Sequence, residues 1–174
     1  MSLDILTPKG AEATNHEQKL LQDICNVWNV DILETPKKEP AKIDGIIIEN
    51  NKMTAVFEDK CRKDMILNDD KELYLKKYDK TVDSWLITYN KIDAGRLIGG
   101  ALGVPFWGFL YLIDQDITLW WEIANKHGEF KEDIVHHNSS TQKTVNGGTI
   151  VRDNAYLPLS SAHYLEDTLG LNNL

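Results

Sequence analysis

The sequence has few cysteines and no long apolar run. Its two cysteines, Cys25 and Cys61, provide no disulfide framework, which is typical of a protein from a reducing compartment. The longest uncharged stretch, residues 97–113, is interrupted by glycines and a proline and is too short to span a bilayer as a helix. The first ten residues show no signal-peptide pattern. We therefore expect a cytoplasmic protein without a membrane partner.

Basic residues are also scarce. The 174 residues include 19 Lys and Arg against 27 Asp and Glu, which gives a net charge of −8. Because acids are interleaved with the lysines, no basic stripe is visible, and such a chain should bind nucleic acid weakly. A bound metal ion could reverse the sign locally, and a homo-oligomer could gather lysines around a groove. The candidate lysines for such a groove are Lys37, Lys38, Lys63, Lys76 and Lys77.

Residues 43–60 are the most informative part of the chain. Two apolar runs flank a polar turn, and the stretch carries Asp44 near its start and Glu58 and Lys60 at its end. This pattern predicts a β-hairpin in a sheet interior, where an uncompensated carboxylate is costly. The three charged residues are therefore candidates for a functional site, and a purely structural ion pair is the alternative.

The turn of this hairpin decides which side chains meet. If Asn50, Asn51 and Lys52 form a three-residue loop, counting back along both strands puts Asp44 opposite Glu58. Their Cβ atoms would lie about 5 Å apart, and Lys60 would return to the same face about 7 Å further along. A two-residue loop would send Asp44 to the other face unless a bulge restores the register.

Asp44, the hairpin and the Glu58-Asp59-Lys60 sequence resemble the motif of the PD-(D/E)XK nucleases, which include restriction endonucleases, phage exonucleases and Holliday junction resolvases. Ile43 stands at the position of the family's proline. The resemblance implies an α/β fold with a restriction endonuclease-like core, an αβββαβ mixed sheet flanked by helices. We expect one nuclease-like domain over residues 1–174, with the core at about 15–125 and a C-terminal extension at about 126–174.

The same resemblance implies a chemistry. Asp44, Glu58 and the carbonyl of Asp59 would bind Mg²⁺, for which Mn²⁺ should substitute, and Lys60 would assist the attacking water. Such an ion acidifies bound water and polarises the phosphate. We expect a magnesium-dependent deoxyribonuclease of a bacterial cell or a phage-infected host, and we favour an endonuclease over an exonuclease. The alternatives are an inactive nuclease-like DNA-binding or assembly module and, more weakly, a hydrolase of small phosphoesters.

A helix is predicted from Thr14 to about Asn29. Leu20, Leu21, Ile24 and Trp28 follow Glu17 at helical spacing, which places this acid on the buried face. Many nucleases of the resembled family have a glutamate in their first helix that reaches the metal site, and Glu17 is the matching residue. A capping box of Thr14 and Glu17 is the alternative.

Further elements follow the same reasoning. Residues 30–35 predict a strand, residues 61–80 a loop or irregular helix, residues 81–102 a long helix ended by Gly103, and residues 106–113 and 117–123 two strands. Lys91 lies on the predicted helix. Family members often place a lysine, glutamine or tyrosine of this helix beside the site, so Lys91 is a candidate catalytic residue, with a solvated helix lysine as the alternative.

The last fifty residues predict less. Gly147 and Gly148 indicate a turn between two extended segments, and Ser160 or Ser161 could cap a last helix running to Leu169. His136 and His137 are adjacent, so in a strand their side chains would point in opposite directions and could not share a metal. We expect exposed loop histidines there.

Overall fold

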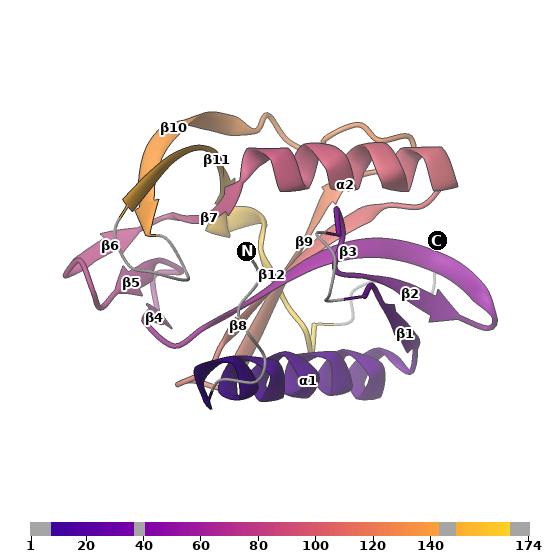
Figure 1. Cartoon of the computed structure of the whole chain (residues 1–174), viewed down its shortest axis with the longest axis horizontal. Coiled ribbons are helices and arrows are strands. Elements are labelled where there is room, and N and C mark those ends of the chain that lie inside the picture. Colours follow the sequence, from indigo (N-terminus) through magenta and orange to yellow (C-terminus); the bar gives the residue numbers. More distant parts are fainter. Residues whose placement is uncertain (1–7, 37–40, 143–148, 168–174) are drawn as a thin grey trace.

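The computed structural model describes residues 8–36, 41–142 and 149–167 and shows an α/β fold (Figure 1). A six-stranded mixed sheet lies at its centre, in the order β1-β2-β3-β8-β9-β12. The strands are β1 (Asp31–Glu34), β2 (Gly45–Glu49), β3 (Lys52–Arg62), β8 (Phe106–Leu112), β9 (Ile117–Ala124) and β12 (His163–Tyr164). β3 and β8 are parallel, and the other neighbours in this sheet are antiparallel.

One helix covers each face of this sheet (Figure 1). α1 (Pro8–Trp28) packs Leu20, Leu21, Ile24 and Trp28 against aromatic residues of β3 and β8, as its helical spacing predicts. α2 (Tyr89–Leu102) packs against the other face. Gly95 permits its close approach, because a Cβ atom there would lie 2.4 Å from the Phe106 ring. The α2 helix ends at Gly103, whose left-handed conformation (φ 71°) suits glycine.

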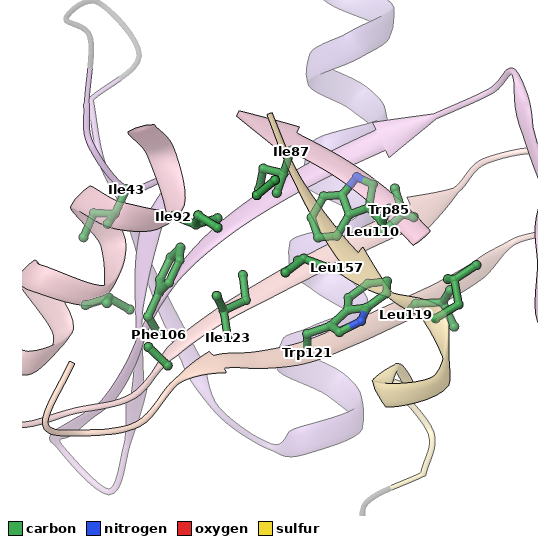
Figure 2. Close-up of a cluster of buried hydrophobic side chains, with 14 of the residues drawn as sticks. Ile43, Trp85, Ile87, Ile92, Phe106, Leu110, Leu119, Trp121, Ile123 and Leu157 are labelled. Carbon is green, nitrogen blue, oxygen red and sulfur yellow. The ribbon is translucent and has the colours of Figure 1, made fainter. Parts of the chain in front are cut away.

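Two small antiparallel sheets complete the fold. One contains β4 (Met65–Leu67), β5 (Leu73–Leu75) and β6 (Lys80–Val82), in that order. The other has the order β10-β11-β7 and contains β7 (Ser84–Thr88), β10 (Val135–Gln142) and β11 (Thr149–Pro158). Side chains of β7 and β11, including Trp85 and Leu157, join α2 in the core on its side of the central sheet (Figure 2).

The first helix begins earlier than predicted. It starts at Pro8, and the Thr14 hydroxyl donates a hydrogen bond to the Gly10 carbonyl (3.0 Å) inside the helix. A capping box of Thr14 and Glu17 is therefore wrong. Proline suits the first turn because its missing N–H would have no intrahelical partner there.

Two predictions for residues 61–88 are also wrong. Residues 61–80 form the end of β3 and the strands β4 to β6, not a loop or an irregular helix. The helix predicted from Thr81 begins at Tyr89, because residues 84–88 form β7, in which Trp85 and Ile87 are buried while their neighbours are half-buried. This alternation has the period of a strand. The predicted strands at 30–35, 106–113 and 117–123 are present as β1, β8 and β9.

The C-terminal segment contributes to the sheets. The predicted strands on either side of Gly147 and Gly148 are β10 and β11, while the two glycines lie outside the described residues. Up to residue 167, the helix predicted from Ser160 or Ser161 to Leu169 is replaced by a single 3₁₀ turn, η1 (Leu159–Ser161), and by β12, while residues 168 and 169 lie outside the described residues. His136 and His137 lie in a strand and not in a loop, although both are exposed. In residues 8–36, 41–142 and 149–167, no helix has the length and apolar character needed to cross a bilayer.

Candidate functional site

The β2–β3 hairpin turns through two residues, not the three predicted. Glu49 pairs with Lys52, and Asn50 and Asn51 form the turn with φ values of 51° and 61°. Two consecutive residues with positive φ define a turn whose twist matches that of a hairpin, and asparagine tolerates this conformation well. On its own, this turn would send Asp44 and Glu58 to opposite faces.

A β-bulge restores the register. Ile48 pairs with Met53 but Ile47 pairs with Ala55, so Thr54 is an extra residue in β3. Its hydroxyl donates a hydrogen bond to the Ile47 carbonyl (3.2 Å). From this point on the strands pair as the longer loop would require, Gly45 lies opposite Phe57, and the next residues are Asp44 and Glu58.

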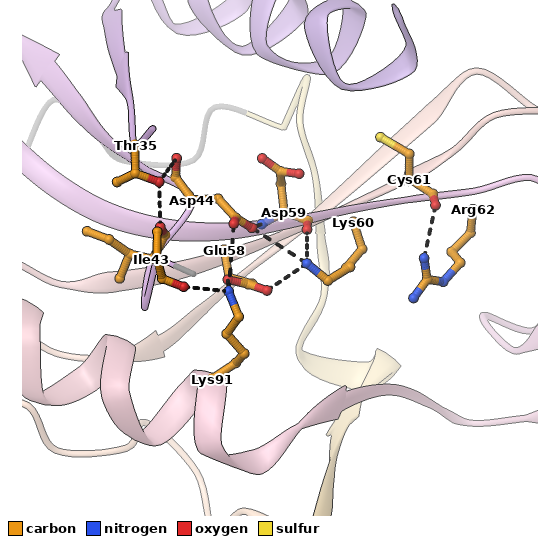
Figure 3. A network of polar contacts seen from close by, with 10 residues as sticks. Thr35, Ile43, Asp44, Glu58, Asp59, Lys60, Cys61, Arg62 and Lys91 are labelled. Atoms are coloured by element: carbon orange, nitrogen blue, oxygen red, sulfur yellow. Dashed lines mark hydrogen bonds and ion pairs between the residues drawn. The ribbon is translucent and has the colours of Figure 1, made fainter. Parts of the chain in front are cut away.

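Four charged side chains converge beyond the bulge (Figure 3). Glu58 is fully buried, and its carboxylate accepts hydrogen bonds from Lys60 Nζ (2.6 Å) and from Lys91 Nζ (3.0 Å). The Asp44 carboxylate accepts a hydrogen bond from the Asp59 N–H (3.0 Å) and lies 3.5 Å from Lys60 Nζ and 3.8 Å from Lys91 Nζ. Each ammonium group therefore contacts both carboxylates. We call Asp44, Glu58, Lys60 and Lys91 the β3 cluster.

Main-chain groups hold this cluster in place. The Thr35 N–H donates to the Asp44 carbonyl (2.9 Å), and the Thr35 hydroxyl donates to the Ile43 carbonyl (2.8 Å). Lys60 Nζ also donates to the Asp59 carbonyl (2.6 Å). The Asp59 carbonyl thus points toward the cluster, whereas its side chain leaves the opposite side of the strand (Figure 3).

The two carboxyl groups have pKa values displaced in opposite directions. Burial favours the neutral form of both. At Asp44, Lys60, the Asp59 N–H and Lys91 outweigh burial and hold the pKa below its ordinary value. At Glu58 burial dominates and raises the pKa, although both lysines oppose it. Burial also acts to lower the pKa of Lys60, but the carboxylates of Glu58 and Asp44 raise it overall. Acids whose pKa values are driven apart in this way are typical of functional sites.

A groove of about 410 Å³ opens beside the cluster, between α1 and the end of β3. Asp44, Asp59 and Lys60 line one side, and the half-buried Glu17 and His16 of α1 line another. The structure therefore places Glu17 on the same groove as Asp44 and Asp59, whereas Glu58 is fully buried and does not line it. The sequence interpretation missed His16, which lies one residue before Glu17 and had no pattern of its own.

Three of the five lysines that a homo-oligomer could gather around a groove lie in the described residues. Lys63 lines the 410 Å³ groove and lies 3.6 Å from Glu12. Lys76 pairs instead with Asp114, and Lys77 lies over the ring of Tyr78 at 5.4 Å from its centroid. Lys37 and Lys38 lie outside the described residues. The described lysines thus give this face little net positive charge.

The donor set of the β3 cluster can be compared with what a metal ion needs. Within the described ranges, no three His, Cys, Asp or Glu side chains form a group that could hold a metal. Asp44 and Glu58 supply two carboxylates, and Asp59 adds a carbonyl oxygen. Oxygen ligands of this kind suit Mg²⁺, which keeps several of its waters and often uses only one or two protein carboxylates. These residues fit such an ion provided that the ammonium groups release some of the oxygen atoms.

Comparison of the chain with protein-family models, with curated proteins and with solved structures gives no match. Membership of the PD-(D/E)XK nucleases therefore stays a prediction from the Asp44 and Glu58-Asp59-Lys60 motif.

Proposed function

We propose that this protein is a metal-dependent nuclease that hydrolyses DNA phosphodiester bonds, built on a restriction endonuclease-like core. One observation carries the proposal: the fully buried Glu58 of β3, Asp44 just before β2 and two lysines converge at one place. The order of the elements supports it, because α1, β1, β2, β3, α2 and β8 follow one another as αβββαβ, with β4 to β7 inserted before α2.

In this proposal Asp44, Glu58 and the Asp59 carbonyl would hold Mg²⁺. The ion would supply acidified water and stabilisation of negative charge on the phosphate. Lys60 would orient the attacking water, whose oxygen bonds to phosphorus as the bond from phosphorus to the leaving sugar oxygen breaks. The proton lost by this water passes to solvent, and the leaving oxygen takes up a proton from solvent to become a hydroxyl. Glu17 contributes from the facing helix as an accessory acid. Glu17, Asp44, Asp59 and Lys60 line the groove between α1 and the end of β3.

A cleavage assay tests this function. Supercoiled plasmid and branched DNA are incubated with the protein and Mg²⁺, alongside Asp44→Ala as the inactive control and Lys131→Met as a surface control. Lys131 pairs with Glu122 at 3.5 Å, is half exposed and has no part in the cluster. We expect nicking by the wild type and by Lys131→Met, none by Asp44→Ala, and loss of cleavage when EDTA is added. Equal results with and without Mg²⁺ on every DNA would refute the nuclease.

The second candidate is a nuclease-like module that binds DNA or assembles without cutting. Two observations favour it: the lysines already compensate both carboxylates, and no third acidic ligand accompanies them in the described part of the chain. Such a module would shift DNA in a gel without any metal and leave it intact with Mg²⁺. Asp44→Ala would then bind DNA as well as the wild type does.

A further inference from the structure

The two lysines of the β3 cluster are held very differently. Lys60 Nζ lies 2.6 Å from both the Glu58 carboxylate and the Asp59 carbonyl, and 3.5 Å from Asp44. Lys91 Nζ lies 3.0 Å from Glu58, 3.8 Å from Asp44 and 3.2 Å from the Ala41 carbonyl. Every contact of Lys91 is thus longer than the two shortest contacts of Lys60, and Lys91 is the more loosely bound of the two.

Their backbone positions reinforce this difference. Lys60 follows Glu58 by two residues in β3, which pairs with β8 at both positions. Its side chain is therefore held on the same side of the strand as Glu58. Lys91 reaches the cluster from the first turn of α2, at the end of its four-carbon side chain (Figure 3). Its neighbour Ile92 is buried in the core and anchors the helix without it. A change of side-chain rotamers would withdraw Lys91 while the backbone stays in place.

The charge balance of the β3 cluster favours Lys91 at the carboxylates when no metal is bound and disfavours it there when a divalent cation binds. Glu58 is fully buried, so its carboxylate needs a cation when no metal is bound. With two carboxylates and two ammonium groups, the β3 cluster is neutral. A divalent cation added to this arrangement would bring two uncompensated charges into a partly buried site. Release of one ammonium group reduces that excess and frees carboxylate oxygens for coordination.

We propose that Lys91 is an exchangeable internal counter-ion, which occupies the carboxylates of Glu58 and Asp44 in the metal-free protein and withdraws when a divalent cation binds there. This inference rests on the metal site of the proposed function. Lys60, by contrast, stays with the carboxylates in both states. The exchange keeps the buried acids compensated until the ion arrives, so that folding does not depend on the metal.

Metal binding without nucleic acid tests the exchange. Mn²⁺ binding is followed by the electron paramagnetic resonance signal of the free ion, and Mg²⁺ binding by calorimetry at fixed ionic strength. Lys91→Met keeps most of the apolar side chain and removes the ammonium group. We expect it to bind Mn²⁺ at least about tenfold more tightly than the wild type, because the carboxylates no longer exchange one cation for another. Mn²⁺ should also raise its melting temperature more than that of the wild type.

Three controls make the result specific. Lys131→Met should bind Mn²⁺ like the wild type, and Asp44→Asn combined with Lys91→Met should lose the tight binding. Lys91→Gln provides a second neutral variant if Lys91→Met does not fold. Equal or weaker Mn²⁺ binding by the neutral variants, or no binding by either wild type or variant, would overturn the exchange. Tight Mn²⁺ binding by Lys91→Met together with failure of the wild type to cleave DNA would refute the nuclease and keep the exchange. DNA cleavage by the wild type together with equal Mn²⁺ affinities of the two proteins would do the reverse.

Discussion

Two clusters of acids and lysines on this fold have similar ion-pair distances but differ strongly in burial. In the β3 cluster, Glu58 is fully buried between Lys60 and Lys91. In the second cluster, Lys19 of α1 lies 2.7 Å from both Asp23 and Asp116, and the Tyr111 hydroxyl donates to Asp116 (2.8 Å). There the side chains of Lys19 and Asp116 are 45% and 66% exposed. We call Lys19, Asp23, Tyr111 and Asp116 the α1 surface cluster.

The comparison shows that short ion-pair distances alone do not identify a site. Exposed ion pairs contribute about 0–1 kcal/mol because water screens them and solvates each charge when the pair breaks. Water cannot solvate a buried carboxylate in this way, so loss of its partner leaves an uncompensated charge at a cost of about 3–5 kcal/mol. A protein keeps such an arrangement at a cost in stability, and for this reason the proposed function is placed at the β3 cluster and not at the α1 surface cluster.

Lys60→Met should have the largest effect on stability. It removes the closest cation of Glu58, and because Lys60 is itself about one-third exposed, we expect the lower end of the buried range, a loss of about 3 kcal/mol. Urea unfolding at neutral pH measures it. Combining Lys60→Met with Glu58→Leu removes the charge that was left unpaired and should recover part of the loss. A loss below that of an exposed pair would mean that the β3 cluster is solvated like the surface one.

Lys91→Met should destabilise the metal-free protein less than Lys60→Met does. Hydrogen bonds to charged groups contribute about 1.5–3 kcal/mol, and Lys60 remains to compensate Glu58, so we expect a loss of about 2 kcal/mol. The measurement is the same urea titration with EDTA present. If Lys91→Met proves more destabilising than Lys60→Met, the assignment of Lys91 as the looser partner is wrong.

Part of this site could be read from the sequence, because strand periodicity is a local property. Alternation along residues 43–60 predicted that Asp44 and Glu58 share a face only in combination with a three-residue turn or a bulge, and helical spacing after Glu17 predicted the buried face of α1. The turn was predicted incorrectly. The bulge at Thr54 restores the register that the shorter turn shifts, and the residue pattern does not predict an extra residue in this strand.

Other features depend on partners that are distant in the sequence. Trp85, Leu86 and Tyr89 fit a helical spacing, whereas Trp85 and Ile87 fit a strand. Residues 84–88 form a strand because they pair with β11, in which Leu157 lies opposite Trp85. For Lys91, a solvated position on the helix was the alternative to a place at the site. The sequence does not decide between them, because its carboxylate partner Glu58 lies 33 positions away in the chain. Sequence patterns report which face of an element is apolar, but not which element that face meets.

Gly95→Ala tests whether the position of α2 matters to the β3 cluster without changing any charge. Its Cβ would approach the Phe106 ring to 2.4 Å, so the helix or the ring must shift. Overpacking costs about 1–3 kcal/mol, and the better helix propensity of alanine offsets up to about 1 kcal/mol. We expect a net loss of about 1 kcal/mol, together with lower Mg²⁺-dependent cleavage. Leu97→Ala, an exposed position on the same helix, is the matched control and should change neither.

Asp116→Asn should have the smallest effect and sets the scale for the α1 surface cluster. Hydrogen bonds from Lys19 and Tyr111 hold the pKa of Asp116 below its ordinary value. A lowered pKa in the folded state means that the stabilisation is present above the ordinary aspartate pKa and disappears as the pH falls through the folded one. Because the pair is exposed, we expect a loss of about 0.5 kcal/mol at pH 7 and none well below the folded pKa. Urea unfolding of wild type and variant, at pH 7 and at a pH well below the folded pKa, measures this loss at low and at high salt. A salt-insensitive loss as large as that of Lys60→Met would remove the distinction between the two clusters. The ion-pair distance would then predict the loss of stability no less accurately than the burial of the pair does.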